Sequence, residues 1–410
     1  MRFDVKDFVE SLPQLDLTVR TQRSEFEERV KRVRGELEKR GLSCGFAYGN
    51  EMRPGDTGWL TGYDPQIESA AVVVGPDKVL LIGGPEGRMY AEEMMQVGEY
   101  RNLVEFKIPE EDYPGVGFSR LEEVLLEACG RDISTIGMLT LPDVVPTSIT
   151  NLVARHGKLV DASDILLDLR YNKSESEQKL MRVAAKISTC GMRAMAEAIE
   201  PGLRETEVAG CGEYAVKAMG ADRYGFSTIV SSGVRASNVL GRASNKVIDR
   251  GDMVVLGISA RYEGLTSCLG RTVVVGRAHP DQLELLQHAL EAYEEAVEHL
   301  RYGGPARNVD TAARRHLARF GLSPLYSLVH GIGWTEAMEG KGAATQHSTY
   351  SFHENISVMV DLGIFGQSFR SLPPQRVGLR YEDPYLINSK GKTERLTDLT
   401  LKAQDLLAHR

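Results

Sequence analysis

The chain has 410 residues, of which 42% are hydrophobic and 26% are charged, and its net charge is -8. A chain of this length is too long for one hydrophobic core, so we expect two domains of ordinary globular composition. The acidic balance argues against nucleic acid as a partner, because binding to phosphates needs a basic surface.

The first residues and the cysteines indicate the compartment of the protein. The start of the chain, Met1-Arg-Phe-Asp-Val-Lys-Asp7, contains acids and no apolar segment of a secretory signal. No run approaches the roughly 18 apolar residues of a membrane-spanning helix, so we expect no membrane partner. The 5 cysteines are widely spaced and odd in number, which favours a reducing cytoplasm over a disulfide framework.

Residues 1–165 are predicted to form a small α/β domain. Apolar residues at helical spacing predict a helix over 25–40, which Gly41 ends as a C-cap. Two short apolar runs, 70–74 and 78–82, flank Gly-Pro-Asp and predict a hairpin. Helix, strand and helix patterns then alternate over 121–126, 135–138 and 145–153.

Residues 166–410 are predicted to form the second domain. A polar segment at 173–177 has capping-box character, and two long helices follow over 175–200 and 204–219, separated by Pro201-Gly202. The later patterns predict strands at 227–230 and 253–259, a helix over 280–300, and strands around Val358 and Leu386.

Four motifs of the second domain resemble those of a known superfamily. Residues 251–272 read Gly-Asp-Met-Val-Val-Leu-Gly-Ile-Ser-Ala-Arg-Tyr-Glu-Gly-Leu-Thr-Ser-Cys-Leu-Gly-Arg-Thr, and residues 329–334 read Val-His-Gly-Ile-Gly-Trp. Residues 354–364 contain Asp361-Leu-Gly, and residues 377–383 read Val-Gly-Leu-Arg-Tyr-Glu-Asp. Together they resemble the signature of the creatinase, aminopeptidase P and methionine aminopeptidase superfamily, which has the pita-bread fold.

The resemblance covers nearly the whole chain, because 34–42 and 58–63 also resemble the creatinase-type N-terminal domain. It implies an α/β (α+β) protein, with a small creatinase-type N-terminal domain and a C-terminal pita-bread domain in which helix pairs cover a curved antiparallel sheet. It also implies a homodimer whose N-terminal domain lies near the partner's active site. We expect the long loop 49–66 to close that site, with Arg53 gripping an anionic ligand.

The family's metal-ligand positions are filled unevenly in this chain. Gly257 and Cys268 stand at the two aspartate positions, whereas His330, Asp361 and Glu382 stand at those of a histidine and two glutamates. Glycine offers no ligand atom, so we expect the family's two-metal centre to be lost and the enzyme to need no cofactor. The alternative is one zinc ion held by Cys268, His330, Asp361 and Glu382, which are all competent zinc ligands.

His330 is the candidate general acid/base, because imidazole titrates near neutral pH. Glu382, with Glu336 or Asp361, is the candidate group that orients and polarises it. Leu240 stands where the family carries a substrate-side histidine, so a creatinase mechanism cannot be transferred unchanged. An arginine fork suits a substrate carboxylate. The candidate substrate-binding residues are Arg53, Arg235, Arg242, His347, His353 and Cys268.

The preferred interpretation is a hydrolase of a C–N bond in a small carboxylate-bearing non-peptide compound, working without the two-metal centre. One alternative is a noncatalytic member of the fold that binds a ligand or peptide. Another is an Xaa-Pro-type aminopeptidase or dipeptidase with a mononuclear metal site. Buried unpaired charges are costly, so a pocket that only binds has no reason to keep His330, Asp361 and Glu382 together. This favours an enzyme.

Overall fold

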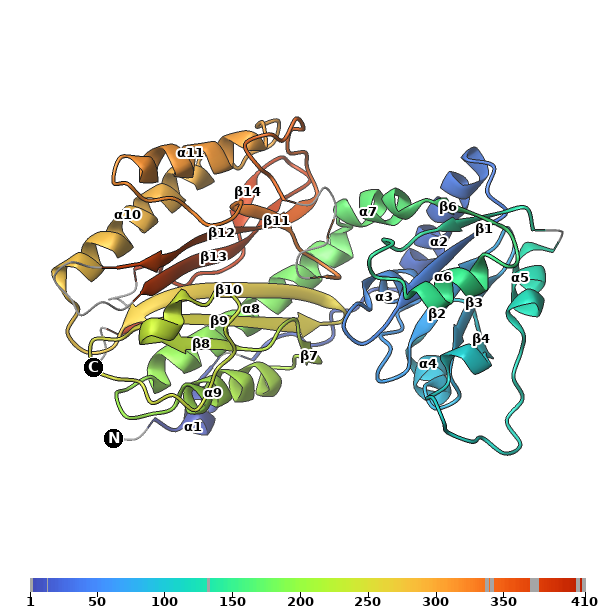
Figure 1. Ribbon diagram of the computed structural model, residues 1–410, viewed down its shortest axis with the longest axis horizontal. Coiled ribbons are helices and arrows are strands. Elements are labelled where there is room, and N and C mark those ends of the chain that lie inside the picture. The colour runs from blue at the N-terminus through green and yellow to red at the C-terminus, as the bar shows by residue number, and fades with distance from the viewer. Residues whose placement is uncertain are drawn as a thin grey trace. The chain divides into compact units, whose positions relative to one another are not determined.

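The computed structural model describes residues 3–12, 14–130, 133–335, 339, 343–368, 376–402 and 406–407. The chain forms two compact units. The N-terminal unit is Thr21–Arg170, and the C-terminal unit combines Met1–Arg20 with Tyr171–Arg410. Figure 1 colours both units along the chain.

This division differs in two respects from the predicted boundary between residues 165 and 166. That boundary falls near the start of α7 (Ser163–Tyr171), whereas the two units divide between its last two residues, Arg170 and Tyr171. In addition, the first residues belong to the C-terminal unit, because α1 (Val5–Glu10) contacts α8 and α9 of that unit. Arg20 also forms an ion pair of 2.5 Å with Glu263.

A six-stranded sheet runs through the N-terminal unit in the order β4-β3-β2-β1-β5-β6. Its strands are β1 (Cys44–Gly49), β2 (Ala70–Val74), β3 (Val79–Gly83), β4 (Glu99–Asn102), β5 (Thr135–Met138) and β6 (Lys158–Asp161). Besides α7, the helices are α2 (Arg23–Lys39), α3 (Gly55–Thr61), α4 (Arg88–Met94), α5 (Leu121–Cys129), α6 (Thr147–Val153) and the 3-10 helix η1 (Val104–Phe106). The predicted hairpin is confirmed as β2–β3, and the pattern that follows it as α5, β5 and α6.

The helix α2 shows how the sequence specifies these elements. Its apolar residues at helical spacing, Phe26, Val30, Val33 and Leu37, are all buried, so one face of the helix packs into the core. The helix ends just before the predicted Gly41, whose φ of 65° is a left-handed conformation that glycine adopts without strain.

The segment 49–66, expected to be a loop, contains the helix α3. Trp59 in this helix is 1% exposed, and the guanidinium of Arg29 lies 5.2 Å from the centroid of its ring. Burial of so large a ring stabilises the helix and removes Trp59 from contact with any partner. Arg53 precedes the helix and is exposed.

An antiparallel sheet runs through the C-terminal unit in the order β11-β12-β13-β10-β9-β7, with β8 paired to β9 and β14 paired to β13. Its strands are β7 (Arg223–Tyr224), β8 (Ile229–Ser232), β9 (Met253–Tyr262), β10 (Leu265–Val274), β11 (Val329–Gly331), β12 (Ile356–Gln367), β13 (Val377–Ile387) and β14 (Thr393–Arg395). Every strand pair described in this sheet is antiparallel, as expected.

Two pairs of long helices accompany this sheet (Figure 1). The first pair is α8 (Glu175–Ala198) with α9 (Glu205–Ala218), and the second is α10 (Pro280–Val297) with α11 (Arg307–Ala318). α8 packs on β9 and β10, whereas α10 packs on β12 and β13. Of these helices only α11 was not predicted. Within the described residues, no helix is long and apolar enough to cross a membrane.

The start of α8 is a capping box, as predicted. Ser174 Oγ accepts a hydrogen bond from the Glu177 backbone at 3.1 Å, and Glu177 Oε2 accepts one from the Ser174 backbone at 3.0 Å. Further along, Ser188 Oγ donates to the Ser267 carbonyl at 2.6 Å and accepts from the Ala260 backbone at 2.9 Å. These bonds fix α8 on the hairpin β9–β10.

A buried ion pair fixes β10 beside β13. Arg271 and Asp383 are 2.9 Å apart, and both side chains are fully buried. Arg271 also donates to the backbone carbonyls of Gly270 at 2.8 Å and Glu382 at 2.9 Å. Asp383 forms a second ion pair with Arg395, at 2.9 Å. This network therefore holds Glu382 in a defined position on its strand.

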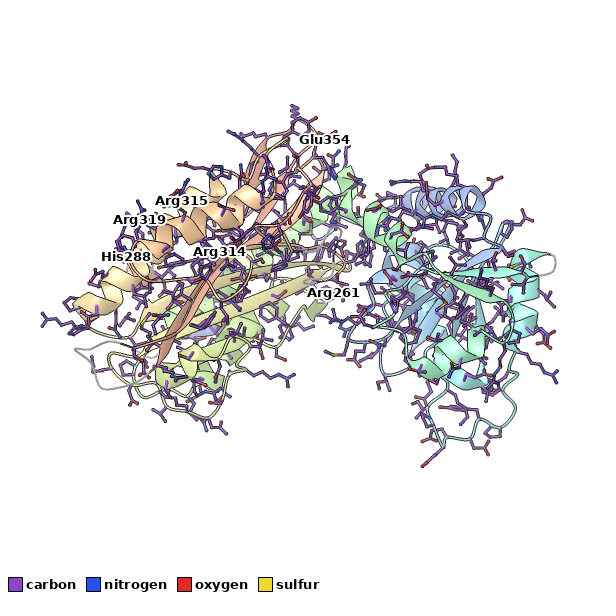
Figure 2. The ribbon with its side chains drawn as sticks, turned by 45° about the horizontal axis from the view of Figure 1, so that its top comes forward. Arg261, His288, Arg314, Arg315, Arg319 and Glu354 are labelled. Carbon is purple, nitrogen blue, oxygen red and sulfur yellow. The ribbon has the colours of Figure 1, made fainter. Side chains whose placement is uncertain are left out.

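Arg314 of α11 fixes the segment that leads into β11, and it is labelled in Figure 2. Its guanidinium donates to the carbonyls of Pro324 at 3.2 Å and Tyr326 at 2.9 Å. It also pairs with Asp310 at 2.7 Å, and Asp310 accepts from the Leu328 backbone at 3.2 Å. The approach to β11 is therefore held by side chains of a neighbouring helix.

Candidate functional site

One lateral row of residues crosses the sheet of the C-terminal unit. In cross-strand register it runs through Ile229, Gly257, Gly270, Glu382 and Asp361. Directly opposed residues of neighbouring strands point to the same face of a sheet, so these positions share one face. The row brings two carboxylates together, and neighbouring side chains, Ile229 and Arg380, fill the space beside the two glycines.

His330, Asp361 and Glu382 form one cluster of donor atoms, all within 4.8 Å of one another. His330 Nε2 lies 3.7 Å from Glu382 Oε1, and His330 Nδ1 donates to the Gly331 carbonyl at 3.1 Å. Cys268 Sγ donates to the same Glu382 oxygen at 3.3 Å. The structure thus brings together three predicted catalytic residues and joins Cys268 to them.

Burial and neighbouring charges shift the pKa values in this cluster in different directions. Burial favours a lower pKa for His330, but the hydrogen bond and charge of Glu382 outweigh it and raise the pKa. Burial favours a higher pKa for Glu382, but His330 and Arg380 outweigh it and lower the pKa. Burial raises the pKa of Asp361 to about 6, against the opposing effect of Arg380. The imidazolium of His330 and the carboxylate of Glu382 stabilise each other.

Arg380 and Tyr326 complete the cluster, and neither was predicted. Arg380 Nε is 3.3 Å from Asp361 Oδ1, and Tyr326 Oη donates to the same oxygen at 2.9 Å. Arg380 also donates to Tyr326 Oη, from Nε at 3.2 Å and from Nη2 at 3.0 Å. Arg380 lies in the same motif as Glu382, and that motif could have identified it as a site residue. Tyr326 lies in none of the motifs.

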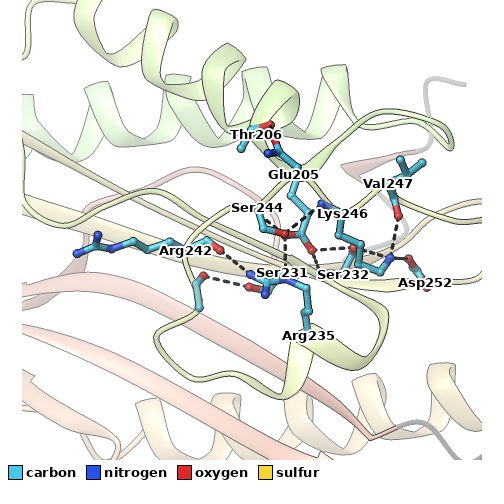
Figure 3. A network of polar contacts seen from close by, with 12 residues as sticks. Glu205, Thr206, Ser231, Ser232, Arg235, Arg242, Ser244, Lys246, Val247 and Asp252 are labelled. Carbon is cyan, nitrogen blue, oxygen red and sulfur yellow. Dashed lines mark hydrogen bonds and ion pairs between the residues drawn. The ribbon is translucent and has the colours of Figure 1, made fainter.

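Arg235 and Arg242 belong to the polar network of Figure 3. Glu205, fully buried at the start of α9, accepts from the backbone and side chain of both Ser232 and Ser244. It also accepts from Arg235 Nε at 3.0 Å, and Arg235 Nη2 donates to the Arg242 carbonyl at 2.7 Å. The guanidinium of Arg235 therefore holds this loop, since a buried carboxylate needs donors, and its role in substrate binding stays a prediction. The exposed side chain of Arg242 stays a candidate for substrate binding.

Two predicted substrate-binding residues, His347 and His353, are not part of the cluster. His347 is exposed, and His353 packs edge-on against Tyr171 with 4.9 Å between the ring centroids. Arg53 is exposed in the N-terminal unit. Glu336 lies outside the described residues. The roles assigned to these residues stay predictions.

The cluster fits one divalent ion and does not fit two. Gly257 offers no ligand atom, and a Cβ added there would lie 3.2 Å from the Cβ of Ile229, which occupies the adjoining space. His330, Asp361 and Glu382 supply one nitrogen and two carboxylates, which matches the three-ligand sets of catalytic zinc sites. Among the described residues, the ligand set therefore fits a single ion and lacks the carboxylate that a second ion would need at position 257.

We expect protein saturated with zinc and then desalted to retain at most one equivalent of zinc per chain, as measured by elemental analysis. Asp361→Ala should lower the affinity for zinc by at least about tenfold, because it removes one of three ligands. The matched control is His347→Ala, an exposed residue outside the cluster, which should leave the zinc content unchanged. Two equivalents in the wild-type protein would contradict the one-ion site.

The chain is similar to peptidases over most of its length. The model of Metallopeptidase family M24 matches residues 179–389. The Xaa-Pro dipeptidases of Pyrococcus horikoshii and Pyrococcus furiosus are each 31% identical to the chain, over 323 and 325 residues. These alignments cover 78% and 77% of the chain, and 86% and 87% of the two relatives. The prolidase structure from Pyrococcus horikoshii is similar with a TM-score of 0.76 and 26% identity, covering 92% of the chain and 99% of that protein.

These similarities confirm two predictions and correct a third. The expected fold, a creatinase-type N-terminal domain followed by a pita-bread domain, is confirmed. The expected class of enzyme, a hydrolase of C–N bonds, is confirmed as well. A creatinase-like, non-peptide activity has no support from these relatives, which are named as dipeptidases. With these motifs, this fold and these relatives, the chain belongs to metallopeptidase family M24.

Proposed function

We propose that the chain hydrolyses the C–N bond of a small Xaa-Pro-type dipeptide, at a site that holds at most one metal ion. The observation that carries this proposal is the cluster of His330, Asp361 and Glu382, whose donor atoms lie within 4.8 Å of one another. The dipeptidases among the relatives support the substrate class. The Xaa-Pro alternative therefore replaces the preferred non-peptide interpretation.

The cluster can move a proton between water and the leaving group. In its neutral form His330 accepts the proton of the attacking water, and Glu382, 3.7 Å away, stabilises the imidazolium that forms. The raised pKa of His330, to which Glu382 contributes, is consistent with this pairing. His330 then gives the proton to the leaving nitrogen. A divalent ion held by His330, Asp361 and Glu382 would supply a polarised carbonyl and an acidified water, and His330 would then serve as its ligand instead of as the base.

The proposal is tested by incubating purified protein with a panel of dipeptides and following free amino acids by mass spectrometry. The panel should contain Xaa-Pro dipeptides, matched dipeptides without proline, and N-acyl, ureido and amidino amino acids. We expect release of proline from at least one Xaa-Pro dipeptide, and loss of this release in the variant His330→Asn. Turnover of the non-peptide compounds alone would contradict the proposal, and binding without any turnover would indicate a noncatalytic member of the family.

The expected homodimer and cytoplasmic location stay predictions. In the segment 49–66, the ring of Trp59 is buried within the N-terminal unit. Arg53 is exposed and remains able to meet a partner. A partner's site would therefore be reached by the part of this segment that precedes α3.

A further inference from the structure

We propose that Arg380 supplies the positive charge that a second metal ion would bring to this site, by stabilising the negative oxygen that forms on the substrate's carbonyl group. This inference rests on the function proposed above. It is carried by three properties of the Arg380 side chain: the space it fills, the contacts that hold one edge of its guanidinium, and an N–H group on the other edge that makes no hydrogen bond within the described residues.

The glycines of the lateral row make room for Arg380. A Cβ added at Gly270 would lie 2.7 Å from Arg380 Cδ and 2.9 Å from Glu382 Cβ. The side chain of Arg380 thus crosses the space that any larger residue at position 270 would fill. Gly257 stands directly opposite Gly270 in the register, so no side chain from that position of β9 competes for the same space.

One edge of the Arg380 guanidinium is held firmly. Arg380 is 5% exposed, its Nε is 3.3 Å from Asp361 Oδ1, and both Nε and Nη2 donate to Tyr326 Oη. Its Cζ lies 5.8 Å from the ring centroid of Tyr326 and 5.9 Å from that of Phe365, where cation–π attraction adds to the ion pair. A charge fixed in advance needs no rearrangement during the reaction, which is what makes electrostatic stabilisation of a transition state effective.

We assign the other edge of the guanidinium to the substrate oxygen. Among the hydrogen bonds of the described residues, those of the Arg380 side chain use Nε and Nη2 and leave Nη1 unused. The cluster beside it holds two carboxylates, Asp361 and Glu382, and the fixed charge of Arg380 offsets that of Asp361, its ion-pair partner. A guanidinium N–H forms a strong, charge-assisted hydrogen bond to an anionic oxygen.

The chemical step balances with the groups on this face. The water oxygen forms a bond to the carbonyl carbon, the proton of the water passes to His330, and the carbonyl π electrons move to the oxygen next to Arg380. When the C–N bond breaks, those electrons re-form the carbonyl, and His330 returns the proton to the leaving nitrogen. Arg380 thus meets a full negative charge only in the tetrahedral state, so it should favour a tetrahedral anion over a planar peptide.

The test compares two non-hydrolysable probes in chelator-treated protein by calorimetry. One probe is a phosphinate isostere of an Xaa-Pro dipeptide, which is a tetrahedral anion, and the other is the planar ketomethylene isostere. We expect the wild-type protein to prefer the phosphinate by at least about 100-fold. Arg380→Met should lose about 100- to 1,000-fold in phosphinate affinity and less than about fivefold in ketomethylene affinity. Arg380→Lys, which keeps the charge, should recover part of the loss.

Tyr326→Phe is the matched control, because it removes the other donor to Asp361 and keeps the guanidinium. It should retain part of the preference for the phosphinate, because Asp361 and Phe365 still hold the guanidinium. Equal losses for both probes in Arg380→Met, or the same loss of preference in Tyr326→Phe, would assign the effect to the shape of the pocket and overturn the inference. No phosphinate preference in the wild-type protein would also overturn it. An Arg380-dependent preference in a protein that cleaves no dipeptide would support the inference while refuting the proposed function.

Discussion

The variant His330→Asn should lower kcat by a factor of about 10² to 10⁴, the usual contribution of a positioned general acid/base. Asparagine keeps some hydrogen-bonding capacity but cannot gain and lose a proton near neutral pH. The residue pairs with Glu382 at 3.7 Å, so the two side chains act as one unit. Initial rates on the Xaa-Pro dipeptide that the wild-type protein cleaves best would measure the loss.

The variant Glu382→Gln should act on the same step. The double variant with His330→Asn should therefore lose little more than the worse single variant, because residues that act as a unit are not additive. Glu382 contributes to the raised pKa of His330, so Glu382→Gln should lower that pKa. The reaction needs neutral His330, so the rate rises with pH through this pKa. The acid limb of the pH profile should therefore move to lower pH in Glu382→Gln.

The control for both variants is His347→Asn, a change of the same chemistry at an exposed position, where the predicted role in substrate binding would alter KM instead of kcat. It should leave kcat within about twofold of the wild-type value, as expected for a residue that contributes no positioned acid/base group. Comparable losses at His347 and His330 would refute the assignment of the general acid/base. Additive losses in the His330 and Glu382 double variant would show that the two residues serve separate steps.

The variant Asp383→Asn should destabilise the C-terminal unit by about 3 to 5 kcal/mol, because it leaves a buried arginine without its charge partner. Arg271 and Asp383 are both fully buried, 2.9 Å apart, and Arg395 makes a second ion pair with Asp383. The side chains would stay close in the variant, but the charge that offsets their burial would be gone. Urea denaturation would give the change in the free energy of unfolding.

The two tryptophans allow the two units to be followed separately. Trp59 lies in the N-terminal unit and Trp334 in the C-terminal unit, and both are buried. In a Trp59→Phe background the fluorescence of Trp334 reports the C-terminal unit alone. The control is Asp398→Asn, which breaks a surface ion pair with Arg193 and should cost less than about 1 kcal/mol. Equal shifts for Asp383→Asn and Asp398→Asn would contradict the structural role of the buried pair.

Elements with a strong local pattern could be predicted from the sequence, and elements that depend on distant contacts could not. The apolar spacing and the terminal glycine of α2 are local signals, and so is the capping box of α8. In α3 the stabilising contact is Trp59 with Arg29, which lies on another helix, so the segment looked like a loop. The predicted boundary fell near the start of α7, whereas most of this helix belongs to the N-terminal unit. No local sequence pattern marks the point at which the two units divide.

The site residues also divide into those that local motifs mark and those that only the structure brings into contact. Motif positions located His330, Asp361 and Glu382, because the register of a sheet converts such positions into neighbours. Tyr326 reaches Asp361 from a segment without a motif, so only the structure could reveal it. The hydrogen bond from Arg235 to the buried carboxylate of Glu205 could not be predicted from the sequence either, because no motif links the two residues.

The packing of Ile229 against Gly257 limits how this chain could acquire a two-metal site. A carboxylate at position 257 would have to displace the isoleucine side chain, whose Cβ lies 3.2 Å from the added Cβ. Overpacking of this kind costs about 1 to 3 kcal/mol in a well-packed core. A substitution that shrinks Ile229 would relieve this crowding, so the same aspartate should cost less stability after that substitution than before it. The order of mutations, as much as their identity, separates this chain from a two-metal enzyme.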